Sequence, residues 1–505
     1  MSTLNNASIA ITTNRNPDYE LQYDDWVMMD DLSKGSRKVK EKGAEYLPMT
    51  ELESREVNSS IGASTKRKTR YQERLSRAVF INGIDRLTKF AMGHLFRESV
   101  KIPKKFSDSH PELMENADLL GTDLKQFMKN VSSRAYTLGH QFVCVDMPKV
   151  APSSLQEQKD MGWRPYLISI DPRDVVDWSI SNDANGIPTL DWVILLRTEF
   201  EERLPFKAAK PRNVYMVWYR DRWERYREDD KFNPIIQESG ENPLGEVPLY
   251  GIYSNLQRPM VSSPPLLEAA FINLNHFQTY SAFTNGLMYH LNPLLAITGV
   301  SEDADVRLTA SSAVYLPREA DAKYVEFQGS GLKIAYDTSK SLSEEMMEAG
   351  LRSTSFLGAN TSAEARRVAK SDFNSFLISV ANSYEHGWMR VFRAVNKWMS
   401  MDSENEADYR PTFNKDFDVT IMDAGLARFY LESLQAGAIC QETFLKSMVR
   451  GEVFAKELDV PKEIIKSAKD AERFVPAKAR GGASNLSPPA NPTLATGPEV
   501  LPKGQ

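Results

Sequence analysis

The sequence predicts an α+β protein in which helices and strands occupy separate stretches of the chain. In several long segments apolar residues recur at steps of three and four, as they do in amphipathic helices. Between about residues 140 and 255 the pattern changes to short runs rich in β-branched and aromatic residues, separated by turn residues. The 505 residues are enough for a large core and roughly two to four structural units.

The charge balance limits the classes of function. Lys and Arg number 62 against 68 Asp and Glu, which gives a formal net charge of -6. A protein that coats nucleic acid is strongly basic, so we expect any contact with DNA to be local or transient. The two cysteines, Cys144 and Cys440, form neither a disulfide framework nor a metal-binding pair and indicate a reducing compartment. The sequence shows no secretory signal and no membrane-spanning run, so we expect a soluble protein without membrane insertion.

The N-terminal part begins with a polar stretch. Residues 1–64 mix Asn, Thr and Ser with charges, and we predict an extended N-terminal arm with one aromatic and acidic patch from Tyr23 to Asp31. A basic run at 66–70 then leads into a helix that carries apolar residues from Phe80 to Leu95. The basic run favours solvated helix surface over a phosphate-binding patch. A second helix is predicted from Asp123 to Leu138 and ends at a glycine.

The β-rich region contains four clear strand patterns and two turn signals. Tight turns are predicted at Asn185-Gly186, which accepts positive φ easily, and at Asp221-Arg222. The predicted strands are Phe142–Val145, Tyr166–Ile170, Trp192–Leu196 and Val214–Tyr219.

A long helix that follows is almost free of charge. Paired serines and prolines begin it, and we place it at 264–291 with Leu267, Phe271 and Leu274 on one face. Glu268 is its only formally charged residue before Tyr289. Such a helix is usually buried between neighbours, either in this chain or in another copy of it.

The second half of the chain carries a small strand-bearing insert between helices. Three strands are predicted within 293–335, namely Leu294–Thr298, Val314–Leu316 and Tyr324–Phe327. A helix at 339–356, a break at 357–363 and the longest amphipathic helix follow, the last with an apolar stripe from Phe373 to Trp398. A strand at Phe417–Ile421 precedes shorter helices. The tail at 476–505, rich in Pro, Ala and Gly, is predicted to be disordered.

No catalytic motif stands out. The usual phosphate-loop, dinucleotide-binding, zinc-protease and paired-cysteine patterns are missing, so we expect no enzyme activity, no cofactor and no metal site. The glycines around Ser330 favour a plain turn between strands over a phosphate loop. Acidic pairs favour solvated surface over a two-metal nuclease site. These pairs are Asp30-Asp31, Asp229-Asp230 and Glu344-Glu345. Six histidines in separate segments favour structural or surface roles; they are His94, His110, His140, His276, His290 and His386.

Short stretches in a consistent order resemble one family of portal proteins found in tailed bacteriophages, and the resemblance covers about residues 20 to 470. In the first third they are Trp26 with Asp31-Leu32 and Gly35, Tyr46-Leu47-Pro48, and Tyr71–Leu75. In the middle they are Arg164–Leu167 with Asp171-Pro172, and Leu244–Leu249. Further on they are Pro264–Leu267, Asn273–His276, and Asn292-Pro293.

The resemblance implies a portal-type fold with a helical and β wing, two stem helices, a small α/β clip insert, a long wing helix and a helical C-terminal crown. The implied parts are the wing at 65–260, the first stem helix at 264–291, the clip at 293–335, the second stem helix at 339–356, the tunnel loop at 357–363, the long helix and strand of the wing at 364–425, and the crown at 426–475. Portal proteins form rings, twelve subunits in this family, with double-stranded DNA in the channel.

The resemblance also implies partners and a location. The partners are further copies of the chain, double-stranded DNA, the terminase, the head-to-tail adaptor and the major capsid protein. The implied location is the portal vertex of the virion capsid, with the host cytoplasm during assembly. The open alternatives are another ring or adaptor component of the virion and, behind it, a metal-dependent nuclease.

Site residues follow from the same resemblance. The tunnel loop would place small, adaptable residues against DNA, which are Gly358, Ala359, Asn360, Thr361 and Ser362. Nearby basic residues would meet phosphates, although ordinary helix surface stays an equal alternative; they are Arg352, Arg366, Arg367 and Lys370. Leu267, Phe271 and Leu274 would pack the stem helix between subunits, with a core helix of the single chain as the alternative.

Overall fold

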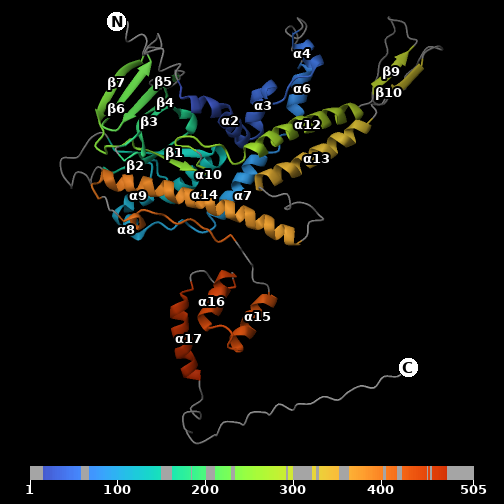
Figure 1. Cartoon of the computed structure of the whole chain (residues 1–505). Coiled ribbons are helices and arrows are strands. Elements are labelled where there is room, and N and C mark those ends of the chain that lie inside the picture. Colours follow the sequence, from blue (N-terminus) through green and yellow to red (C-terminus); the bar gives the residue numbers. More distant parts are fainter. Residues whose placement is uncertain are drawn as a thin grey trace, which may run out of the picture. The chain divides into compact units, whose positions relative to one another are not determined.

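The computed structural model shows a mixed helix and sheet protein in two units, Met1–Phe417 and Asp418–Gln505 (Figure 1). It describes residues 15–58, 68–148, 162–183, 185–200, 211–228, 234–256, 258–291, 294–298, 321–325, 329–351, 363–401, 405–417, 424–451, 453–454 and 458–474. The α+β class predicted from the sequence agrees with this mixture. No helix among these residues is long and apolar enough to span a membrane.

The N-terminal stretch is helical rather than extended, so the prediction of an arm is wrong for residues 17–58. Three helices form here, α2 (Pro17–Lys34), α3 (Ser36–Lys42) and α4 (Glu51–Asn58). The C-terminal half of α2 is buried on nearly every side, from Trp26 to Leu32, and Tyr19 is buried near its start. Because Asp30 and Asp31 are buried with the apolar residues while Leu21 is exposed, the sequence shows no amphipathic period here.

Five helices follow before the first strand. They are α6 (Arg70–Arg77), α7 (Gly83–Leu95), α8 (Lys104–Ser109), α9 (Pro111–Glu115) and α10 (Leu124–Leu138). The predicted helix at 123–138 is confirmed as α10. The carboxylate of Asp123 accepts a hydrogen bond from the Gln126 amide at 3.0 Å and caps the helix. Gly139 ends it with φ 92, and an added Cβ would lie 2.4 Å from the Ser262 carbonyl oxygen.

Two antiparallel sheets form the β-rich region. The first has the order β2 (Tyr166–Ile170), β1 (His140–Asp146), β8 (Leu249–Tyr253), with β1 in the centre. The second is a five-stranded meander of β3 (Val175–Asn182), β4 (Pro188–Phe200), β5 (Pro211–Tyr219), β6 (Arg222–Glu228) and β7 (Pro234–Glu241). The turn at Asn185-Gly186 is confirmed, with φ 79 at Gly186. The next turn precedes Arg222, where β6 begins.

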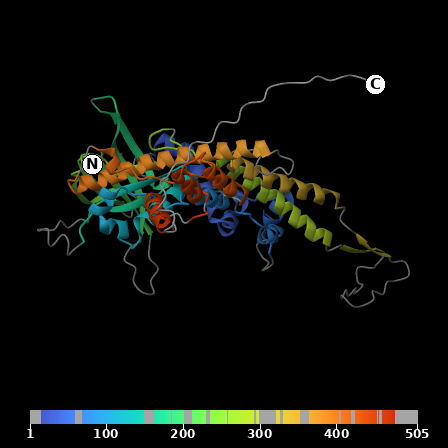
Figure 2. The same cartoon turned by 90° about the horizontal axis from the view of Figure 1, so that it is seen from below.

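A helical hairpin and a long helix complete the first unit. The hairpin consists of α12 (Leu267–Leu291) and α13 (Ser330–Leu351), with the ribbon β9 (Leu294–Thr298) and β10 (Asp321–Val325) at its end (Figures 1 and 2). Helix α14 (Ala363–Trp398) follows. The predicted strand Val314–Leu316 lies outside the described residues.

Helix α13 begins at Ser330 rather than Ser339, so the plain turn predicted around Ser330 and the last residues of the predicted clip belong to a helix. Helix packing explains the difference. Gly286 of α12 lets Leu332 approach so closely that a Cβ on Gly286 would lie 2.7 Å from its Cδ2. The predicted end at Phe356 lies outside the described residues.

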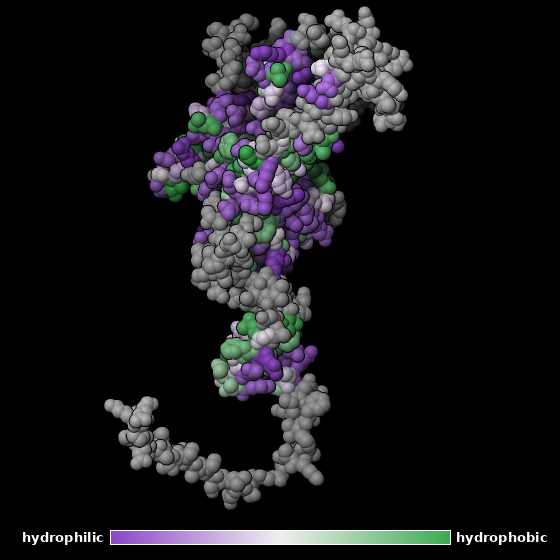
Figure 3. Space-filling view, turned by 90° about the vertical axis from the view of Figure 1, so that its right-hand side faces the viewer, coloured by the Kyte–Doolittle hydropathy of each residue, from purple (hydrophilic) through white to green (hydrophobic). Residues whose placement is uncertain are grey.

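The described residues of the second unit form three short helices, α15 (Ala424–Gln435), α16 (Gln441–Arg450) and α17 (Val460–Phe474). They match the helical region predicted for 426–475, except that α15 begins two residues earlier. Phe417, the first residue of the predicted strand Phe417–Ile421, is not in a strand, and the rest of that strand lies outside the described residues. Hydrophobic side chains reach the surface in patches in each unit (Figure 3). In the described part of the first unit, three single-turn helices also form, at Gly43–Glu45, Pro172–Asp174 and Glu406–Asp408.

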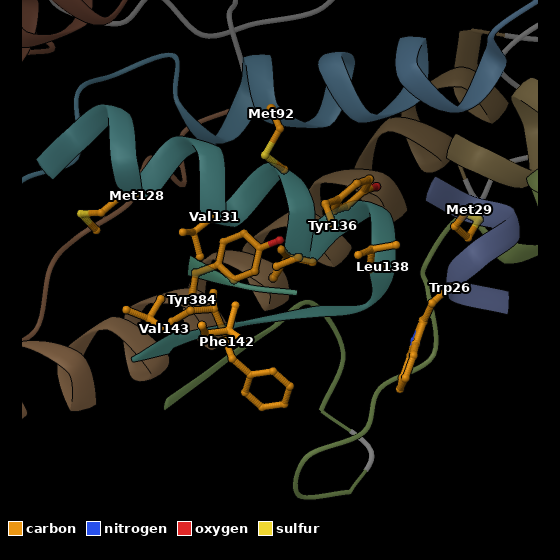
Figure 4. Packing of buried hydrophobic residues seen from close by; sticks show 14 of the residues in the cluster. Trp26, Met29, Met92, Met128, Val131, Tyr136, Leu138, Phe142, Val143 and Tyr384 are labelled. Carbon is orange, nitrogen blue, oxygen red and sulfur yellow. The ribbon is translucent and has the colours of Figure 1, made fainter. Parts of the chain in front are cut away.

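The core of the first unit lies between α10, β1 and α14. Figure 4 shows Val131 of α10, Val143 of β1 and Tyr384 of α14 in this layer, and all three are at most 1% exposed. The predicted apolar stripe of α14 is confirmed, because its members are buried up to Val395. Gly387 lets α14 lie against β8, since a Cβ there would come within 2.8 Å of the Ile252 side chain.

Candidate assembly surface

The hairpin of α12 and α13 is fixed to the first unit through one face of α12. Ala270, Asn273, Phe277 and Ser281 recur at helical spacing and are each 0% exposed. The Phe277 ring meets that of Phe80 edge to face, with centroids 5.7 Å apart. The uncharged character of α12 is therefore explained in part by packing within the chain, as the core-helix alternative expected.

Polar side chains also hold α12 in place. The Asn273 amide donates to the Ile81 carbonyl at 2.9 Å, and its oxygen accepts from the Gly83 amide at 3.3 Å. Further along, Gln278 donates to the Tyr46 carbonyl at 3.1 Å. Buried polar groups that are satisfied in this way fix orientation, so the hairpin leaves the body in a defined direction.

The three residues predicted to pack between subunits divide into two groups. Leu267 and Leu274 are partly buried against the core of their own chain. Phe271 is 55% exposed. The structure therefore leaves Phe271 accessible to another molecule, whereas the other two already contribute to the fold.

Six large apolar side chains are exposed along the hairpin, and we call this set the hairpin surface. On α12 they are Phe271 at 55%, Met288 at 40%, Tyr289 at 55% and Leu291 at 64% exposed. On α13 they are Ile334 at 68% and Tyr336 at 51%. Five of the six lie in the last turn of α12 and the first turns of α13, at the ribbon end of the hairpin, and exposed apolar residues that gather in this way mark interaction surfaces in soluble proteins.

The residues predicted to touch DNA are not brought together in the described part of the chain. The tunnel loop residues, Gly358 to Ser362, and Arg352 lie outside the described residues. Arg366, Arg367 and Lys370 belong to the first turns of α14, and only their backbone is described. Their contact with phosphates stays a prediction.

The acidic pair Asp30-Asp31 is buried, which corrects the prediction of a solvated face. Asp30 is 1% exposed and accepts from Lys34 at 2.7 Å, from Arg134 at 2.8 Å and from Arg173 at 2.7 Å. Burial alone would raise the pKa of Asp30, but the Lys34 hydrogen bond and the two guanidinium groups outweigh it and lower that pKa to about 2. The sequence could not show this, because two of the three partners lie more than a hundred residues away.

Asp31 is satisfied by different partners. The Tyr46 hydroxyl donates to it at 2.8 Å, and Lys42 lies at 3.3 Å. Of the other pairs, Glu344-Glu345 is exposed as predicted, and Asp229-Asp230 lies outside the described residues. Within the described residues no group of three or more His, Cys, Asp or Glu side chains is placed to hold a metal ion.

The histidines stand apart from one another in buried and exposed positions. His140 is 0% exposed between aromatic rings, and burial lowers its pKa to about 3. His276 is also buried and stacks on Tyr280. His110 is buried with Asn396 as its partner. His290 and His386 are exposed, and His94 is half-buried. These positions fit structural or surface roles.

Comparisons with known proteins show similarity to a family model and to solved structures. A family model described as a domain of unknown function, DUF4055, matches residues 265–399, from the start of α12 to the end of α14. A chain from the solved structure of the virion of a native gene transfer agent particle is similar at 12% identity with a TM-score of 0.38. That similarity covers 70% of this chain and 85% of the other. No curated protein matches the sequence.

Proposed function

We propose that this chain is a portal protein, the subunit of a ring at one capsid vertex through which double-stranded DNA enters and leaves. The observation that carries the proposal is the rigid hairpin α12–α13, which bears a two-stranded ribbon at its end and large apolar residues exposed along it. A helical hairpin with a ribbon at its end supports the proposed stem helices and clip, and the proposal includes a non-enzymatic role.

The hairpin surface suits packing between copies. Between Pro264 and Tyr289 the only formal charge is Glu268, so a neighbouring copy that covers α12 has at most one carboxylate to accommodate. Contacts between unlike faces of identical subunits close into a ring when their rotation allows it. In the proposal the ribbon β9–β10 serves as the docking platform for terminase and later for the adaptor.

Electron microscopy of the purified full-length protein tests the ring directly. Negative staining should show rings with a central hole, and native mass spectrometry should give one dominant oligomer, expected near twelve subunits. A chain that stays monomeric at all concentrations and ionic strengths would contradict the proposal.

The DNA channel has a separate test. Removing the charges of Arg366 and Arg367 together should lower the amount of DNA packaged or retained, while rings still form, because cations beside the channel contact phosphates. The measurement is DNA protected from nuclease per assembled particle. The matched control is Arg428→Ala/Lys446→Ala, which removes exposed cations from α15 and α16. Unchanged packaging in the Arg366 and Arg367 variant would exclude their contact with DNA.

A further inference from the structure

The loop between α9 and α10 presents two leucines to solvent at its tip. Leu119 is 44% and Leu120 is 88% exposed. We call this pair the leucine knob. An isolated exposed leucine is ordinary, but two adjacent ones on a short loop are costly in water unless another molecule covers them.

The knob is held in one conformation. Leu119 has φ 62, a left-handed backbone that branched side chains rarely adopt. The Asp118 carboxylate accepts from the Leu120 amide at 2.9 Å and from the Thr122 amide at 3.2 Å. The Asn116 side chain accepts from the Gly121 amide at 2.9 Å. A loop ordered in advance loses little conformational entropy when it binds.

The loop is tied to one edge of the first sheet. The Leu167 amide of β2 donates to the Ala117 carbonyl at 2.9 Å, and β2 is an outer strand of the order β2-β1-β8. The knob therefore extends from the β2 edge of this sheet.

A pocket lies along the opposite edge, at β8. We call it the β8 pocket. Its volume is about 190 Å³, and its lining includes Ile180, Leu190, Leu249, Leu256, Met260 and Arg390. An apolar cavity of about 150 Å³ holds a benzene-sized molecule, so the β8 pocket has room for a leucine side chain, which has fewer carbon atoms.

Charge also matches between the knob and the pocket. No Lys or Arg occurs between Phe106 and Leu124, and Glu115 beside the knob is exposed. Arg390 at the pocket is exposed, with its guanidinium 5.7 Å from the Tyr250 ring centroid. The exposed Glu115 beside the knob complements Arg390 at the pocket, although Arg164 also lies against the knob loop, and the pocket offers polar as well as apolar lining.

We propose that the leucine knob of one copy enters the β8 pocket of the next copy, and that this contact links neighbouring wings around the ring. The inference rests on the proposed ring. A knob and a pocket on opposite edges of one sheet form a head-to-tail contact, which propagates from copy to copy rather than stopping at a dimer. A larger and more apolar pocket of about 340 Å³, beside Trp163 and Arg164, lies next to the knob itself, and a reciprocal knob contact there would pair two copies.

Disulfide trapping distinguishes these arrangements. In a Cys440→Ser background, which removes the exposed native cysteine, Leu120→Cys combined with Leu256→Cys should give a ladder of covalent multimers after mild oxidation. Leu256 is 58% exposed at the pocket. The ladder should be visible on a non-reducing gel and should disappear with reductant. Cys144 is buried in β1 and stays unreactive.

Two controls distinguish a specific contact from disulfides that form by random encounter of exposed cysteines. Each single cysteine variant should give at most dimers. Leu120→Cys with Lys340→Cys, which places the second cysteine on exposed α13, should give no ladder. Efficient dimers from Leu120→Cys alone, without a ladder in the double variant, would show a two-fold contact and overturn the proposal.

The result also separates this inference from the ring itself. Rings in the microscope without a ladder would overturn the knob contact and leave the portal proposal standing. If neither rings nor a ladder form, both proposals are overturned.

As a second measurement, Leu119→Gly/Leu120→Ser should weaken association about tenfold or more, since exposed apolar anchors dominate such contacts. Glycine accepts the φ of Leu119 without strain, so the variant should fold, and unchanged association would again overturn the contact.

Discussion

Replacing Phe271 and Ile334 together by glutamate should convert rings into monomers. Both side chains belong to the hairpin surface, at 55% and 68% exposure, and the ring would bury them against a neighbouring copy. A carboxylate buried there without a partner costs several kcal/mol at each contact, and the cost recurs around the ring. The fold of the single chain should be unaffected, because exposed positions change stability by only about 0.5 kcal/mol.

Native mass spectrometry at matched concentration measures the oligomer, and thermal unfolding of the same samples measures the fold. The control is Lys340→Glu, an equally exposed position on α13 whose side chain is already charged. The control should keep the oligomer of the parent protein. If the double variant forms the same oligomer as the control, in the same amount, the hairpin surface is not buried between copies.

Segments in which apolar residues recur at helical spacing predicted their helices well, and segments without such a pattern did not. Helix α10 and the stripe of α14 follow from apolar spacing, because both bury a wide continuous face. Helix α2 was missed because its buried residues include two aspartates and surround the helix, so they leave no apolar stripe of helical period in the sequence. The start of α13 was missed for another reason, since its first turns are held by packing on Gly286 of α12.

The candidate surface was predictable in its location but not in its detail. The lack of charge in α12 indicated a packing helix, yet it could not say which face the chain itself covers. Leu267 and Leu274 turn inward because they share the helix edge next to Ala270, whereas Phe271 points away. The leucine knob had one signal in the sequence, two leucines followed by Gly121 between aspartates, which is typical of an exposed turn.

The buried position of Asp30 predicts a large effect on stability. Asp30→Ala should lower the free energy of unfolding of the first unit by about 2 to 3 kcal/mol, because Arg134 and Arg173 keep only Asp171 as a carboxylate partner in a partly desolvated site. Urea unfolding followed by tryptophan fluorescence would measure it, since Trp26 lies on the same helix. The control is Asp85→Ala, whose ion pair with Lys89 is exposed and should contribute less than about 1 kcal/mol.

The same carboxylate gives the prediction a pH dependence with a definite sign. The pKa of Asp30 is about 2 in the folded chain, below the ordinary value of 3.8. Its contribution is therefore complete above about pH 5 and is lost as the pH falls through 2, and it amounts to about 2 to 3 kcal/mol. Asp30→Asn should remove this part of the acid dependence, so the stability difference from the parent should shrink between pH 5 and pH 2. A difference that stays constant over that interval would mean that the charge of Asp30 does not stabilise the fold, and that α2 is held to the unit by Trp26 and its apolar neighbours alone.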